Sequence, residues 1–119
     1  MIDSVVMSRT FVIAALLLAS CNAVGQYKCR SRQSEAKATL GQIKAAEATY
    51  FAAKKKYTAS TEELGIAVSP RYYGIELSIS GDGAGYKAIA KGDKPETQDD
   101  EWSVDQSGTI TAVHDKCHE

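Results

Sequence analysis

The chain has 119 residues, of which 24% are charged, and a formal net charge of −1. This size and charge balance predict one small domain behind a targeting segment. They argue against broad electrostatic capture of nucleic acid, which needs a clustered basic surface. No nucleic-acid partner is therefore expected.

The N-terminus has the pattern of an export signal. Arg9 precedes an apolar run from Phe11 to Ala19, and Leu18-Ala-Ser-Cys21 has the pattern of a lipobox. The apolar run is about nine residues long, whereas a helix needs roughly twenty to cross the hydrocarbon core of a bilayer. Because the thiol of Cys21 is the atom that would accept diacylglycerol, we predict a lipoprotein held at the membrane by its N-terminal lipid.

Two alternatives stay open for this segment. An ordinary signal would be cleaved near Ala19 or Ala23, and an uncleaved segment would remain as a short stem. If Cys21 is lipidated, Asn22 rather than aspartate follows it, which favours the outer membrane, with the domain facing the periplasm or the cell surface. The predicted division is a lipoprotein signal at residues 1–20, a tether at 21–30 and a globular domain at 31–119.

Apolar and aromatic residues then recur at intervals of three and four, which predicts an amphipathic helix from Ser31 to Tyr57. Lys54-Lys-Lys56 is expected in its last turn, where cations interact favourably with the helix dipole. Binding of phosphates or acidic lipid headgroups is the functional alternative to a solvated helix end. The expected buried stripe consists of Ala36, Leu40, Ile43, Ala46 or Glu47, Tyr50, Ala53 and Tyr57.

A capping box and four strands follow the helix. Ser60-Thr-Glu-Glu63 predicts a short helical turn ending at Gly65, with the serine and the last glutamate capping each other's backbone. Ser80–Gly85 and Asp105–Gly108 are predicted turns between strands. The fold class is therefore α+β, a long helix packed on an antiparallel sheet of about four strands. The strands are indicated by Tyr73, Ile75, Leu77 and Ile79, by Tyr86, Ala88 and Ala90, by Trp102 and Val104, and by Ile110 and Ala112.

Six pieces of the chain carry a family resemblance. They are Ser31–Lys37, Ala46–Phe51, Tyr57 before Glu62–Gly65, Gly85–Gly92, Asp100–Gly108, and Cys117 near the end. In this order and at this spacing, the chain resembles a type IV pilin or a type II secretion pseudopilin over about residues 31–117. The resemblance implies a pilin-like fold, a structural role without catalysis, and pilus or secretion-system proteins as partners.

The N-terminus departs from that family. Phe11 follows Thr10 rather than glycine, so the family's cleavage site is missing. At the family's glutamate position, five residues into the mature chain, Ala15 or Val5 stands, according to whether counting starts at Phe11 or at Met1. We therefore expect a structural or interaction module of the cell envelope. The alternative is a divergent minor pilin or pseudopilin that enters a pilus or secretion fibre.

The cysteine count bears on the same question. Three cysteines in an exported protein leave one without a disulfide partner. Lipidation of Cys21 would leave Cys29 and Cys117, and their pairing would close nearly the whole mature domain. Family pilins more often pair the terminal cysteine with one nearer the sheet, so two separate thiols remain the alternative.

Ligand sites are scarce in the sequence. Oxygen-rich loops bind calcium, and related pseudopilins hold calcium in a loop near this region, which makes Asp93, Asp99 and Asp100 weak candidates. Their spacing matches no defined calcium loop, so a solvated acidic loop is expected and no cofactor is predicted. His114, Cys117 and His118 lack a fourth ligand for zinc, and we predict no metal site there.

Catalysis is not expected either. Both histidines lie among the last few residues, so no set of nucleophile, base and orienting group can be assembled, and we expect no small-molecule substrate. Aromatic residues are the remaining feature. Tyr50, Tyr57 and Tyr73 are assigned to the core, which leaves Phe51 and Tyr72 as candidates for a protein interface.

Overall fold

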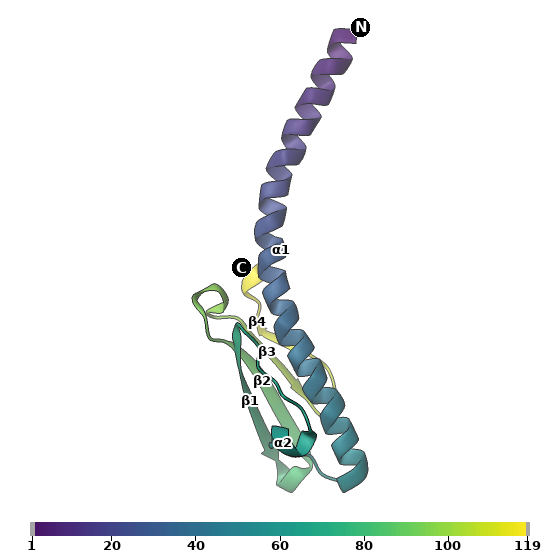
Figure 1. Ribbon diagram of the computed structural model, residues 1–119, viewed down its shortest axis with the longest axis vertical. Helices are drawn as coiled ribbons and strands as arrows, with labels where there is room; N and C mark the ends of the chain where they lie inside the picture. Colours follow the sequence, from purple (N-terminus) through teal and green to yellow (C-terminus); the bar gives the residue numbers. More distant parts are fainter. Residues whose placement is uncertain (1, 119) are drawn as a thin grey trace.

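A long helix lies across an antiparallel sheet in the computed structural model, which describes the backbone of residues 2–118 and the side chains of residues 25–117. Helix α1 (Ile2–Lys54) extends beyond the sheet at its N-terminal end, and its C-terminal part covers one face of the sheet (Figure 1). The C-terminal end of the chain, yellow in Figure 1, returns to lie against α1. The helix projects from only one end of the sheet domain, and this distinguishes that end from the other.

The sheet is a four-stranded meander in the order β1-β2-β3-β4, and each neighbouring pair is antiparallel. Strands β1 and β2 pair along their whole length, while the register of β3 and β4 shifts by a bulge between Glu101 and Trp102. This arrangement confirms the predicted α+β fold with four strands. The strands are β1 (Tyr73–Ser80), β2 (Gly85–Gly92), β3 (Glu101–Asp105) and β4 (Thr111–His114).

The core lies between α1 and the helix-facing side of the sheet. Ala88 and Ala90 on the central strand β2 are fully buried, and their short side chains leave room for the helix. The predicted stripe is confirmed at Ala36, Leu40 and Ile43. Further along, Glu47 rather than Ala46 is the buried residue, and Ala53 is exposed. Among the side chains of residues 25–117, the remaining buried apolar residues are Tyr73, Tyr86, Trp102 and Val104.

Helix α1 ends at Lys54, three residues before the predicted end at Tyr57. The next residue, Lys55, has a left-handed φ of 60°, which turns the chain out of the helix. The backbone N–H of Tyr57 then donates to Gly83 O at 2.9 Å and ties this turn to the β1–β2 connection. Of the three lysines expected in the last helical turn, only Lys54 is there.

Of the two reciprocal hydrogen bonds that the capping box predicts for the short helix α2 (Thr61–Leu64), one is present. Glu63 N donates to Ser60 Oγ at 3.2 Å, and Gly65 ends the helix in the left-handed conformation. The Glu63 carboxylate does not return to the backbone of Ser60. It accepts instead from the hydroxyls of Tyr50 at 2.7 Å and Thr58 at 3.0 Å, and these hydrogen bonds hold the pKa of Glu63 below its usual value. Tyr50, which is expected in the core, is only half-buried. Its hydroxyl forms the hydrogen bond that links α1 to α2.

Candidate functional site

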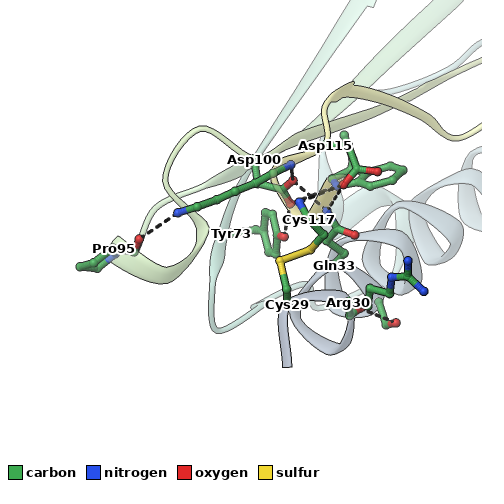
Figure 2. Close-up of a disulfide and its surroundings, with 11 residues drawn as sticks. Cys29, Arg30, Gln33, Tyr73, Pro95, Asp100, Asp115 and Cys117 are labelled. Atoms are coloured by element: carbon green, nitrogen blue, oxygen red, sulfur yellow. Dashed lines mark hydrogen bonds between the residues drawn. A yellow bond between two sulfur atoms is a disulfide. The ribbon is translucent and has the colours of Figure 1, made fainter. Parts of the chain in front are cut away.

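A disulfide joins α1 to the C-terminal tail. Cys29 pairs with Cys117, 88 residues later, with the two Cα atoms 5.8 Å apart (Figure 2). The predicted pairing is thus present. The disulfide ties down the C-terminal end of the chain, which lies at the end of the sheet domain from which the N-terminal part of α1 projects (Figure 1).

Beside the disulfide, Asp100 forms the centre of a buried polar network (Figure 2). Its Oδ1 accepts from Gln33 Nε2 and from the backbone N–H of Lys116, both at 3.0 Å. Its Oδ2 accepts from the Tyr73 hydroxyl and from Trp102 Nε1, the latter at 3.1 Å. A buried carboxylate is costly unless donors surround it, and here four donors from α1, β1, β3 and the tail do so. Asp100 therefore links the four segments that meet at this end of the domain.

A second carboxylate connects the same helix to the tail. Gln33 Nε2 donates to Asp115 Oδ1 at 2.6 Å, and the N–H of Cys117 donates to the same oxygen at 3.1 Å. Gln33 is only 4% exposed, so its amide is shared between the two aspartates inside the junction. Burial and the hydrogen bond to Asp100 raise the pKa of the Tyr73 hydroxyl, which keeps it a donor. We call Cys29, Gln33, Tyr73, Asp100, Trp102, Asp115 and Cys117 the junction cluster.

The loop before Asp100 is held by close backbone packing. The N–H of Gly92 donates to Asp100 O at 2.8 Å, and Thr97 Oγ1 donates to Tyr72 O at 2.7 Å. A Cβ built on Gly92 would lie 1.8 Å from Thr97 O, so only glycine permits this approach. The loop that contains the turn η2 (Pro95–Thr97) thereby holds Asp100 beneath α1.

The three calcium candidates are not brought together as ligands. Asp93 and Asp99 are exposed, whereas Asp100 is 2% exposed and bonded to four protein donors. Among the described side chains, no group of three or more histidine, cysteine, aspartate or glutamate residues is placed to hold a metal ion.

The two aromatic candidates for an interface lie at different ends of the domain. Phe51 stacks on Tyr57 near the end of α1, with ring centroids 4.6 Å apart. The N–H of Tyr72 donates to Glu35 Oε1 at 2.8 Å, and Glu35 precedes Phe51 by sixteen residues on α1. At the helical rise this separation is about 24 Å, so Phe51 and Tyr72 do not form one surface. The interface prediction itself remains a prediction.

The predicted lipidation site, Cys21, lies outside the residues whose side chains the structure describes. Its lipidation and the division of the chain at residues 20 and 30 therefore remain predictions. Residues 21–30 are part of α1. Within the described part of the chain, no helix combines the length and apolarity needed to cross a bilayer.

Comparison with known proteins places this architecture in a recognised class, because a long helix on an antiparallel meander is shared with solved pilins. No protein-family model matches the chain, and no curated protein matches it in sequence. A type IV pilin from Shewanella oneidensis is similar with a TM-score of 0.57 and 21% identity, over 70% of this chain and 90% of that one. The non-core minor pilin PilV of Neisseria meningitidis is similar with a TM-score of 0.57 and 17% identity, over 76% and 92%. The chain has the pilin fold.

Proposed function

We propose that this chain is an exported pilin-like protein that is held at the cell envelope by a lipid on Cys21. The observation that carries the proposal is a pilin fold behind an N-terminus with the pattern Leu18-Ala-Ser-Cys21. No carboxylate stands at the family's glutamate position in either register, which argues against assembly as a major pilin. The domain serves as a structural or interaction module of the envelope, with the outer membrane as its location.

The junction cluster supports a role without catalysis. Asp100, its buried carboxylate, has both oxygens bonded to protein donors, and Cys29 and Cys117 are joined in a disulfide. None of these groups is left to act as a base or a nucleophile toward a substrate. Their arrangement serves to fix the tail and the sheet to α1.

A second function has its own supporting observation. Helix α1 continues without a break from Ile2 to Lys54, as a stem that enters a fibre would. One of the two similar structures is a minor pilin. A divergent minor pilin or pseudopilin that is incorporated into a pilus or secretion fibre through an uncleaved stem is therefore the alternative.

Intact mass spectrometry of the protein extracted from cell membranes distinguishes the two functions. The lipoprotein proposal expects a chain that begins at Cys21 and carries diacylglycerol and a further acyl group. In a Cys21→Ser variant this mass should disappear, and the protein should leave the membrane fraction. A chain that retains residues 11–19 and carries no lipid would overturn the lipoprotein proposal and support the pilin-type stem.

A further inference from the structure

A groove of about 420 Å³ lies beside the junction cluster, at the end of the domain nearest the projecting helix. Its basic side chains are Lys28 and Arg32 from α1 and Arg71 from the segment before β1. Tyr27 and Tyr72 supply its aromatic rings. We call this surface the basic groove.

The positive charges converge because the fold holds two segments together. Lys28 and Arg32 are four residues apart, which places them on one face of α1. Glu35 accepts from the N–H of Tyr72 at 2.8 Å, and this bond keeps the neighbouring Arg71 beside the helix. The guanidinium of Arg32 lies over the ring of Tyr72 at 5.4 Å. The groove is therefore a built surface to which separate parts of the sequence contribute.

The groove has an excess of positive charge. Three cations face one carboxylate, and that carboxylate, Glu35, already accepts a backbone hydrogen bond. Within residues 25–117, no ion pair neutralises Lys28, Arg32 or Arg71. Lys28 and Arg71 are exposed, so their charges are available to an anion from outside.

Tyr27 gives the groove an exposed apolar ring. Its side chain is 73% exposed, against 47% for Val113, the other exposed large apolar side chain in the described part of the chain. A tyrosine has an apolar body and a polar tip, which suits the layer between water and hydrocarbon at a membrane surface. Its neighbour Lys28 adds the cation that attracts anionic headgroups.

The position of the groove along α1 places it near the membrane. Tyr27 follows Cys21 by six residues, a rise of about 9 Å in a helix, and Arg32 lies about 17 Å from Cys21. An anionic membrane surface attracts basic residues within a Debye length of about 8 to 10 Å, so Arg32 comes within range when α1 lies down along the surface, which is the orientation that docking of the groove requires. Lys54, at the other end of the sheet domain, is more than thirty residues from Cys21 along the same helix.

We propose that the basic groove docks on the surface of the anchoring membrane. Lys28, Arg32 and Arg71 bind the phosphates of anionic lipid headgroups, while Tyr27 lies in the interfacial layer. The inference rests on the proposed attachment through the N-terminal segment, and it holds for the lipid on Cys21 and for a helical stem alike. Docking fixes the orientation of the domain, with one side of it against the bilayer.

The test uses the full-length wild-type protein as recovered from membranes, placed in phosphatidylcholine vesicles with or without phosphatidylglycerol. Amine labelling followed by peptide mass spectrometry compares Lys28 with Lys54, which serves as a reference in the same molecule. On the anionic vesicles we expect Lys28 to label about fivefold more slowly relative to Lys54, with recovery in high salt. Equal relative labelling on both vesicles overturns the docking proposal.

Vesicle flotation separates this result from the proposed anchor. Protein that floats with both kinds of vesicle is anchored, so equal labelling of Lys28 then contradicts the groove alone. Protein that floats with neither vesicle overturns the anchor and the docking that depends on it. Protein that floats only with the anionic vesicles supports the groove and contradicts the anchor.

Charge variants test whether the groove itself is responsible. Arg71→Gln should remove most of the protection of Lys28 on anionic vesicles, because one basic residue near such a surface contributes about a fivefold effect. Lys87→Gln removes the same charge from an exposed position on β2 and should leave the labelling unchanged. Arg32→Lys should keep the protection that Arg32→Gln loses, because the charge is preserved. Equal effects of the Arg71 and Lys87 changes would show general attraction and would overturn the proposal.

Discussion

The disulfide between Cys29 and Cys117 should account for a large part of the stability of the fold. It closes a loop of 88 residues, for which the chain-entropy relation gives about 4.6 kcal/mol at room temperature. We propose the double variant Cys29→Ser with Cys117→Ser in a Cys21→Ser background, in which no thiol can mispair. The folded state should persist, because the N–H of Lys116 still donates to Asp100 and holds the tail.

Urea unfolding followed by circular dichroism measures this effect. The control is the Cys21→Ser chain with its disulfide intact. The free energy of unfolding should fall by about 4 to 5 kcal/mol, and the m-value should rise because the unfolded chain without the cross-link is more expanded. A loss below about 2 kcal/mol, or a loss with an unchanged m-value, would refute the argument that the bond acts on the unfolded chain.

Two further substitutions test buried carboxylates by urea unfolding. In Asp100→Asn, an amide NH2 group, itself a donor, replaces one of the two accepting oxygens, and this should lower the free energy of unfolding by about 3 kcal/mol. Asp99→Asn on the exposed neighbour should change the free energy of unfolding by less than about 0.5 kcal/mol. Equal losses in the two variants would contradict the network. Burial raises the pKa of Glu47 above its usual value of 4.5, and one of its oxygens has no partner among the described residues, while the other accepts from Thr58 N at 3.0 Å. The folded state therefore holds the carboxyl proton of Glu47 more tightly than the unfolded chain does. The stability that this protonation contributes is present below the usual pKa and is lost as pH rises through the raised pKa. Glu47→Gln should weaken this pH dependence and raise stability near pH 7 by about 1 kcal/mol, as measured by unfolding between about pH 4 and pH 8; an unchanged pH profile would contradict this assignment.

The fold was predictable because its signals are local and repeated. The spacing of Ala36, Leu40 and Ile43 marks one helix face, and that face is the one buried against the sheet. Alternation marks the buried face of β1, β2 and β3 in the same way, but not that of β4, whose four residues, Ala112 included, are all exposed. The end of α1 was predicted three residues late, because the contacts that end it, such as the bond from Tyr57 N to Gly83 O, come from a distant turn.

The junction cluster was only partly predictable. The cysteine count indicated the pairing of Cys29 with Cys117 without its geometry. The sequence predicts a solvated acidic loop around Asp100, yet the fold buries this residue among donors that lie far away in the sequence. One signal was available for Gln33, which precedes Ala36 by three residues and therefore continues the buried stripe with a polar side chain. Such a residue in a stripe needs a partner, but the sequence does not say which.

The junction between the tail and α1 also determines how the domain carries mechanical load. A pull from the N-terminal attachment enters through α1, which passes directly into the core. Strand β4 cannot be peeled away from the free chain end, because Cys117 is bonded to Cys29 on the loaded helix itself. A load that is applied to the sheet must therefore shear α1 along its contacts with β2 and β3, a path that resists force at many contacts at once, whereas a load on the C-terminal end passes through the disulfide into α1 and bypasses the sheet.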